Sequence, residues 1–344
     1  MPLARASGTT RAADPDRNAL AACGGTDHTI PIALAARGSV QSGFNEVALG
    51  ARGLVGVARP HRSLQIPESA KVRFLADRQQ GSRTMLTGMT EDDWAIVLQV
   101  FAAAQSRCGQ PGQDDRKFLE ALHFFTVHNL TWRALPATFG LWNSIWKRFW
   151  RLSRSGVIEA FFQLLAETSK TAHLVQMLDS TTVRAHVSAA GAEGGQEHQA
   201  LGRSRGGFCC KIHLKTDFDG LPIAFHLTGG EVHDTTQFTT SLDIGPDITP
   251  RAAVTDKGYD SKKNRTACRE RGIVAVIPYR ATTKDRPKYF PKLLYRGRAR
   301  IEQAIGKLKR FKRIAMRCEK TAESFAAFVA FACGLILVKS VHRA

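Results

Sequence analysis

Three acidic residues, Asp179, Asp256 and Glu302, are the strongest candidates for chemistry in this chain of 344 residues. Asp179 follows the apolar segment 174–178, and Asp256 ends the segment 252–256, so both are expected where a strand meets a loop. Carboxylate oxygens are ligands that Mg²⁺ prefers. Two such ions about 3.5–4 Å apart can activate an attacking oxygen and stabilise a leaving one in phosphodiester chemistry. Taken alone, however, each aspartate is more often a cap before a turn.

Glu302 lies in a segment that is predicted to be helical from about residue 295 to 311. At about 100° per residue, the side chains of Tyr295, Arg298, Glu302 and Lys309 share a sector roughly 60° wide. The apolar side chains from Ile301 onward fall in a separate sector, so the helix buries one stripe and presents the polar stripe beside it. Such a stripe can hold a metal ion while its cations contact phosphates. The alternative is a solvated ion pair between Glu302 and Arg298.

The charge balance favours a polyanionic partner. The chain has 49 Lys and Arg against 30 Asp and Glu, for a formal net charge of +19. Basic side chains neutralise phosphates and release counterions, although ribosomal, nuclease and membrane-surface proteins share this property. Fifteen basic residues against three acidic ones lie between Arg280 and Lys320, around Glu302. This run predicts a DNA-binding surface, and a solvated charge run is the alternative.

The elements that must position these residues fall into two classes. Helical patterns cover about 90–101, 116–128 and 141–152, with a turn at Phe139-Gly140, which is typical of a helix-turn-helix. The last helix combines tryptophans with basic residues that are expected to contact DNA, namely Lys147, Arg148, Arg151 and Arg154. An ordinary helical bundle with a solvated basic face is the alternative.

From Leu174 onward, short strands and helices alternate. Strands are predicted at 174–178, 208–216, 221–227, 252–255 and 273–277; helices are predicted at 235–242, 264–271, 295–311 and 322–339. The pattern predicts an α/β fold with a mixed sheet flanked by helices, as in a ribonuclease-H-like fold. We therefore divide the chain into a helical DNA-binding module at 85–160 and a catalytic domain at 170–344. Residues 1–84 show no sustained period and are expected to be a disordered or spurious N-terminal extension.

Other classes of protein are disfavoured. Seven cysteines without a CxxC pair indicate a reducing cytoplasm rather than a disulfide scaffold. The zinc alternative at Cys209, Cys210 and His213 fails because alternate strand residues point to opposite faces and Cys209 and His213 lie about 13 Å apart. No phosphate-binding P-loop is present, so no nucleotide cofactor is expected. The longest apolar run, 325–338, is shorter than the roughly 18–20 residues of a membrane span and predicts a buried helix.

The spacing of four residues also resembles a known family. Tyr295, Arg298, Glu302 and Lys309 are similar to the YREK pattern of DDE transposases from bacterial insertion sequences, in the group named after insertion sequence five. Further segments that resemble this family are 178–186, around Asp179, 203–213, 228–234, 256–260, around Asp256, and 132–140. The resemblance covers residues 89–339.

The resemblance implies a ribonuclease-H-like catalytic domain in which Asp179, Asp256 and Glu302 bind the metal ions. It implies two Mg²⁺ ions, which Mn²⁺ could replace, and DNA cleavage and strand transfer at the terminal inverted repeats of an insertion sequence. The expected partners are these repeats, target DNA and further copies of the chain, in a homodimer or larger synaptic complex associated with the bacterial nucleoid and not with a membrane. DNA-binding or site-supporting roles are predicted for Tyr295, Arg298, Lys309, Lys147, Arg148, Arg151 and Arg205.

Two alternatives stay open at this point. One is a ribonuclease-H-like nuclease that cleaves without joining. The other is a non-catalytic DNA-binding relic of a transposase.

Overall fold

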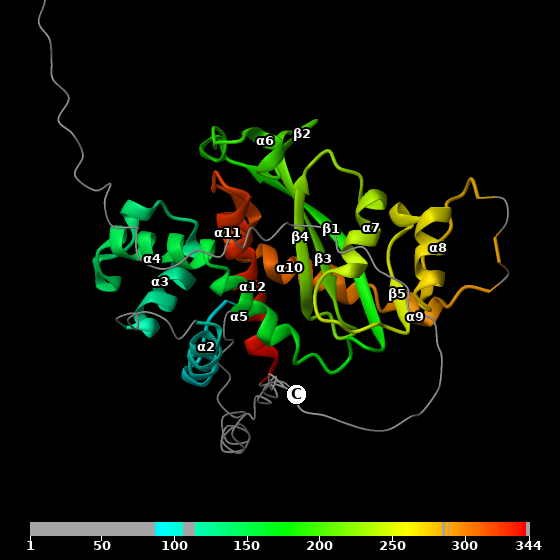
Figure 1. Cartoon of the computed structure of the whole chain (residues 1–344), viewed down its shortest axis with the longest axis horizontal. Coiled ribbons are helices and arrows are strands. Elements are labelled where there is room, and N and C mark those ends of the chain that lie inside the picture. The colour runs from blue at the N-terminus through cyan, green and yellow to red at the C-terminus, as the bar shows by residue number, and fades with distance from the viewer. Residues whose placement is uncertain (1–86, 106–113, 284–285, 288, 342–344) are drawn as a thin grey trace, which may run out of the picture. The chain divides into compact units, whose positions relative to one another are not determined.

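The computed structural model describes residues 87–105, 114–283, 286–287 and 289–341 (Figure 1). The predicted N-terminal extension at 1–84 lies outside these residues. The described chain begins with helices, continues into a seven-stranded sheet and ends with helices. This order confirms the predicted α/β fold.

Four α-helices and two short 3₁₀ turns precede the sheet. They are α2 (Glu91–Ala104), α3 (Asp115–His128), η3 (Trp132–Ala134), η4 (Ala137–Phe139), α4 (Trp142–Arg154) and α5 (Val157–Ala166). The first three α-helices confirm the three predicted helical patterns, and the fourth was not predicted. A capping box opens α2: Thr90 Oγ1 accepts from the Asp93 amide, and the Asp93 carboxylate accepts from the Thr90 amide. Gly140 ends η4 with φ of 104°, which confirms the turn before α4.

The strands form a mixed sheet with the order β2-β3-β1-β5-β6, while β4 pairs with β3 and β7 with β1. Their bounds are β1 (Val175–Ala185), β2 (Gly202–Ser204), β3 (Gly207–Thr216), β4 (Pro222–Gly229), β5 (Ala252–Val254), β6 (Val274–Val276) and β7 (Met316–Arg317). Strand β3 is antiparallel to β1 and β4, whereas β5 and β6 run parallel to β1. An antiparallel meander followed by parallel strands with helical connections is the ribonuclease-H-like arrangement.

Strand β1 corrects one prediction. The sequence indicated that this strand ends at Asp179, but β1 continues to Ala185. The parallel pairing with β5 stops at Met177, whereas the antiparallel pairing with β3 continues through Arg184. The β-branched residues of Thr181-Thr182-Val183 favour the extended backbone that this partner requires. Asp179 therefore lies within a strand, just beyond the end of its parallel neighbour.

Helices cover both faces of the sheet, and each face has its own core. On one face α7 (Asp234–Asp243) and α8 (Lys262–Glu270) bury Phe238 and Cys268 together with Leu178 of β1. On the other face α10 (Ala299–Lys309) and α12 (Ala322–Val341) pack in a larger core with Met177 and Val183 of β1. Because side chains alternate along a strand, Asp179 belongs to the α10 face and Ser180 to the α7 face.

The predicted helix 295–311 is divided into two helices. Helix α9 spans Lys292–Arg296, α10 spans Ala299–Lys309, and Gly297 and Arg298 form the turn between them. Gly220, in the β3–β4 turn with φ of 75°, packs against this junction: a Cβ there would lie 2.8 Å from the Arg300 carbonyl oxygen. Tyr295 is therefore on a different helix from Glu302. The angular sector that was predicted for one continuous helix does not apply to Tyr295.

The remaining elements are short, apart from α12. They are η5 (Val187–Ala189), α6 (Gly195–His198), η6 (Lys257–Tyr259) and α11 (Lys312–Ala315). Among the described helices, α12 is the one that is long and apolar enough to cross a membrane. However, 72% of its apolar 18-residue stretch is buried inside the protein. It confirms the buried helix that the apolar run predicted.

One core joins the N-terminal helices to the sheet. Phe125 of α3 and Phe149 of α4 both stack on Phe328 of α12, with ring centroids 5.6 and 4.4 Å apart. Helix α5 packs along α12 as well. The division into a module at 85–160 and a domain at 170–344 stays a prediction.

Candidate active site

Asp179 stands at the centre of the candidate site. Its Oδ1 accepts from the Ser180 amide at 2.8 Å, and its Oδ2 accepts from Arg298 Nη2 at 2.8 Å. Burial raises the pKa of the Asp179 carboxyl, the Arg298 charge opposes this shift, and the negative charges of Asp256 and Asp234 add to it. The site therefore concentrates negative charge around a partly desolvated carboxylate, which is where a cation is most strongly favoured.

Asp256 lies two residues after the end of β5 at Val254, whereas the predicted strand 252–255 would have ended next to it. It is the N-cap of η6, and its Oδ1 accepts from the Gly258 amide at 2.9 Å. A Cβ at Gly258 would lie 2.9 Å from the same oxygen, so glycine lets this carboxylate fold back over the turn. One carboxylate oxygen thus fixes the local turn, and the other accepts no hydrogen bond from the residues that the structure describes.

Glu302 is in the first turn of α10 and is the most exposed of the three acids, with 57% of its side chain accessible. Its Oε1 accepts from Arg298 Nη1, one turn earlier. The structure therefore contains the i,i+4 pair that was the alternative reading of this helix. The pair is not on an isolated solvated face, because the same guanidinium also contacts Asp179.

Arg298 joins the acids to one another. The guanidinium is hydrogen-bonded to Asp179 of β1 and to Glu302 of α10. Burial lowers the pKa of Arg298, but the charges of Asp179, Glu302 and Asp256 outweigh burial and raise the pKa overall. All three predicted acids therefore act on one cationic side chain, although they come from separate parts of the chain.

The donor set fits a hard divalent cation, since all three side chains offer carboxylate oxygens. Within the described part of the chain, no three His, Cys, Asp or Glu side chains are close enough together to hold one ion. Asp179 and Glu302 instead meet through the Arg298 guanidinium. A metal site here would use Asp179, Asp256 and Glu302 after the guanidinium has moved.

The other predicted residues of the YREK pattern lie near the site but differ in their contacts. Lys309 Nζ donates to the Thr182 carbonyl of β1 at 3.4 Å, so it lies along the same strand as Asp179. Tyr295 is half-buried against the core and packs edge-on to Phe290 with ring centroids 5.4 Å apart. The described contacts of Tyr295 therefore do not include an acidic residue of the site.

The basic residues predicted on other elements divide into two groups. Lys147 and Arg151 of α4 are exposed, and so is Arg205 in the turn between β2 and β3. Arg148, in contrast, forms an ion pair with Asp115 of α3 and lies over the Phe118 ring. Its position between two helices indicates a contribution to packing.

Asp234 was not among the predicted site residues. It is the first residue of α7, and its Oδ1 accepts from Ser180 Oγ at 2.7 Å and from Lys211 Nζ at 2.9 Å. The sequence signal was only a His-Asp pair within a family-like segment. The contact depends on the register that pairs Ser180 with His213 and Thr182 with Lys211.

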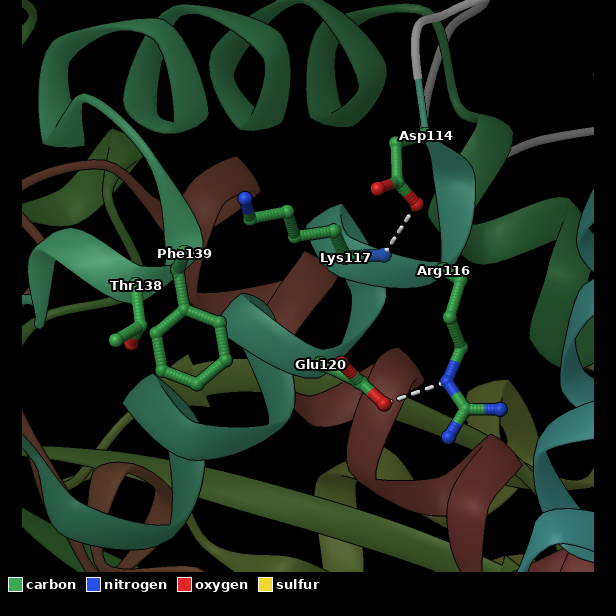
Figure 2. A pocket seen from close by; sticks show the side chains of 6 residues that line it. All are labelled: Asp114, Arg116, Lys117, Glu120, Thr138 and Phe139. Carbon is green, nitrogen blue, oxygen red and sulfur yellow. Dashed lines mark hydrogen bonds and ion pairs between the residues drawn. The ribbon is translucent and has the colours of Figure 1, made fainter.

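A separate polar pocket lies in the helical region and involves none of these acids. Figure 2 shows its lining residues, which come from α3, the N-cap of α3 and η4. Arg116 Nε and Glu120 Oε1 form an ion pair at 2.5 Å. The complete lining is Asp114, Arg116, Lys117, Glu120, Thr138 and Phe139. Asp114 uses its carboxylate to cap α3, and Arg116 and Glu120 pair with one another, so three of the six lining residues already have structural partners.

Comparison with known proteins adds two family matches. Residues 170–337 match the family described as "Transposase DDE domain", and residues 89–162 match the family described as "Putative transposase of IS4/5 family". The second matched segment covers the helices α2 to α5 and the first covers the sheet with its helices.

Curated relatives agree with these families. The chain is 35% identical over 143 residues to "Putative transposase for insertion sequence element IS402" of Burkholderia cepacia, covering 39% of this chain and 65% of the relative, slightly under two thirds. It is 32% identical over 130 residues to "Putative transposase for insertion sequence element IS6501" of Brucella ovis, covering 38% of this chain and 98% of the relative.

Solved structures are more distant. The piggyBac transposase synaptic complex with hairpin DNA gives a TM-score of 0.38 at 9% identity, covering 79% of this chain and 71% of that chain. The Mos1 strand transfer complex gives a TM-score of 0.23 at 11% identity, and the match covers 70% of this chain and 91% of that chain. The family assignment rests on the sequence matches and not on these scores.

Proposed function

Because this chain belongs to the insertion-sequence transposases with a DDE domain, we propose that Asp179, Asp256 and Glu302 form its catalytic metal site. The reaction is strand cleavage at the terminal inverted repeats of the element, followed by joining of the released end to target DNA. The observation that carries this assignment is the shared guanidinium of Arg298, which brings together an acid of β1 and an acid of α10. The charge of Asp256 acts on both Asp179 and Arg298.

The three carboxylates would hold divalent ions, Mg²⁺ or Mn²⁺, in the place that Arg298 now bridges. When bound, such ions polarise the scissile phosphate and lower the cost of forming the attacking oxygen nucleophile. Asp179 is rigid because it lies within a paired strand, and Asp256 is fixed by the turn at Gly258. Glu302 is more exposed, so it can close over a substrate that enters from solvent.

Arg298 has a second role in this proposal. A guanidinium released from Asp179 and Glu302 lies beside the reacting phosphate, whose oxygens it can contact with paired hydrogen bonds. Lys309 lies on the same side of β1 through its contact with Thr182 and adds a further cation. The residues that neutralise the acids in the protein alone would thus neutralise DNA in the complex.

The exposed face of α4 is the proposed surface for end recognition. Trp146 and Trp150 are 38% and 44% exposed, and Lys147, Arg151 and Arg154 are exposed on the same side of the helix. Arg154 lies over the Trp150 ring, 5.0 Å from its centroid. Basic side chains position DNA through its phosphates, and aromatic and polar side chains at the same surface can contact bases. Two ends must be brought together, so a homodimer or larger assembly is expected.

The experiment that tests this function uses the full chain, Mg²⁺ and a duplex with the terminal repeat of the element and its flanking DNA. Asp256→Ala should abolish nicking at the repeat boundary while leaving binding of the repeat within about twofold, because phosphate contacts dominate affinity. Asp247→Ala, an exposed acid in the loop before β5, is the matched control and should cleave normally.

The products separate the alternatives. Nicks accompanied by joined products with target DNA support a transposase, whereas nicks without joined products indicate a nuclease. Unchanged cleavage by Asp256→Ala would contradict the catalytic assignment, and binding without any cleavage by the wild-type chain would indicate a relic that only binds DNA.

A further inference from the structure

The two aspartates of the candidate site come from different strands, so something must set their separation. Asp179 lies in β1 beyond the last residue that pairs with β5, and Asp256 lies in the turn after β5. The pairing between β1 and β5 therefore ends before it reaches either carboxylate. Two metal ions work together only at about 3.5–4 Å from one another, which requires tight control of their ligands.

The first turn of α7 contacts both aspartate segments. Asp234 accepts from the Ser180 hydroxyl, one residue after Asp179, and Thr235 Oγ1 donates to the Gly258 carbonyl at 2.5 Å, two residues after Asp256. Consecutive residues of one helix thus hold the two segments. The buried Tyr259 side chain, next to Gly258 in η6, also lies beside Ser180, so α7 acts together with this contact.

The contact at Ser180 is made from behind the site. Asp179 and Ser180 are consecutive in β1, so Asp179 faces α10 and Ser180 faces α7. Asp234 therefore contacts the Asp179 segment through the Ser180 hydroxyl, and its charge also acts on the Asp179 carboxyl. Its carboxylate also accepts from Lys211 Nζ, which is 12% exposed and donates to the Val232 carbonyl just before α7 as well.

The contact at Gly258 is reinforced in the same way. Asn264 of α8 donates to the Thr235 carbonyl at 3.2 Å and to the Tyr259 carbonyl at 2.9 Å. At the other end of α7, the buried Lys215 ammonium donates to the carbonyls of Leu242 and Ile244. Both ends of the helix are therefore attached to the sheet, and its first turn has little freedom to shift.

We propose that the first turn of α7 is a clamp that sets the separation of Asp179 and Asp256, with Asp234 and Thr235 as its positioning residues. This inference rests on the proposed function, because it concerns the same metal site. When a residue that orients a metal ligand without touching the metal is replaced, the affinity for the metal usually falls by about 10–100-fold. The clamp should therefore act on metal binding before it acts on DNA binding.

The test measures Mn²⁺ binding to the full chain by calorimetry, without DNA. Asp234→Ala should weaken Mn²⁺ binding by about 10–100-fold, and Thr235→Val should weaken it in the same direction. Asp234→Asn keeps an oxygen that accepts from Ser180 and should restore much of the affinity. The matched control is Asp243→Asn, which removes an ion pair with Arg271 at the opposite end of α7 and should bind Mn²⁺ as the wild type does.

Two further measurements distinguish positioning from a loss of folding. Ser180→Ala should weaken Mn²⁺ binding as Asp234→Ala does, and the double variant should lose little more because both changes remove one contact. In cleavage assays, raising the Mn²⁺ concentration should restore the rate of Asp234→Ala but not that of Asp179→Ala. Thermal unfolding of each variant without Mn²⁺ identifies any that fail to fold, and Thr235→Val, which removes the contact with Gly258, serves in place of such a variant.

The outcomes separate this inference from the proposed function. If Asp179→Ala abolishes Mn²⁺ binding while Asp234→Ala and Thr235→Val bind Mn²⁺ like the wild type, the clamp is refuted and the metal site stands. If Asp179→Ala binds Mn²⁺ like the wild type, the metal site itself is refuted.

Discussion

Two basic segments of the chain use their charges differently. On α4, Lys147, Arg151 and Arg154 are exposed, and the tryptophans between them are partly exposed as well. In the run from Arg280 to Lys320, in contrast, four arginines that are buried or half-buried have partners inside the protein: Arg298, Arg300, Arg313 and Arg317.

The difference follows from where the segments lie. Helix α4 contacts the core with one side only, so the residues of its other side remain in solvent. The C-terminal run passes from α9 through α10 and α11 to β7 and crosses the core, so long arginine side chains meet carbonyls, acids and rings there. Charge density in the sequence therefore overestimates the DNA-binding surface around Glu302. The exposed basic residues of the described part of that run are Arg280, Arg286, Lys292, Arg296, Lys309, Arg310, Lys312 and Lys320.

The largest effect that would sharpen this comparison is expected at Arg313. Its guanidinium pairs with Glu319 and donates to the Asn129 Oδ1 and the Leu130 carbonyl at 2.8 and 2.9 Å. Arg313→Ala leaves Glu319 buried without its cation, so the free energy of unfolding should fall by about 3–5 kcal/mol in urea titrations. The exposed neighbour Lys312→Ala should change it by less than about 0.5 kcal/mol. Equal effects at the two positions would contradict the division into internal and external charges.

A second effect is expected from Lys215, a lysine on the sheet that is only 1% exposed. Burial lowers its pKa to about 8 from the ordinary 10.5. Because the folded pKa is lower than the unfolded one, the unfolded state binds the proton more tightly between these values. The contribution of Lys215 to the free energy of unfolding should therefore increase by at most about 3 kcal/mol as the pH increases from about 8 to 10.5.

The measurement for Lys215 is the difference in unfolding free energy between the wild type and Lys215→Met across that pH range. The difference should grow toward high pH in favour of the wild type, because neutral lysine still donates to the carbonyls of Leu242 and Ile244. A difference that stays constant from pH 8 to 10.5 would show that the buried amine does not titrate there.

The smallest effect concerns α4 and its two kinds of basic residue. The double variant Lys147→Ala, Arg151→Ala should bind terminal-repeat DNA about tenfold more weakly and reduce the salt dependence by about two counterions. Arg148→Ala should instead lower the midpoint of thermal unfolding and leave the salt dependence unchanged, because Arg148 is paired with Asp115. If Arg148→Ala reduced the salt dependence as much as the double variant, the division of the basic residues of α4 into DNA-contacting and packing residues would be wrong.

Much of the local structure was predictable because its cause is local. The capping box at Thr90 and Asp93, the turn at Gly140 and the apolar run of α12 each depend on residues that are near in sequence. Asp256 was also placed correctly to within one residue, just after a short buried strand. These features follow from backbone preference and from the periodic burial of side chains.

The predictions failed where a distant partner decides the conformation. The polar residues after Asp179 seemed to end a strand, but β3 supplies hydrogen bonds along all of them and β1 continues. The helix around Glu302 has good periodicity, yet it divides at Gly297-Arg298, where a Cβ at Gly297 would lie 3.3 Å from the Phe218 ring of the β3–β4 turn. Neither partner can be identified from the segment itself.

By itself, the sequence identified three candidate acids, the pattern that relates them to a family, and much of the order of helices and strands, because each depends on residue type and local period. Only the tertiary structure decided that Arg298 contacts both Asp179 and Glu302, and that Asp234 lies behind Asp179. The physical reason is strand register: the pairing of β1 with β3 sets which side chains share a face, and neighbours on one face can be far apart in the chain.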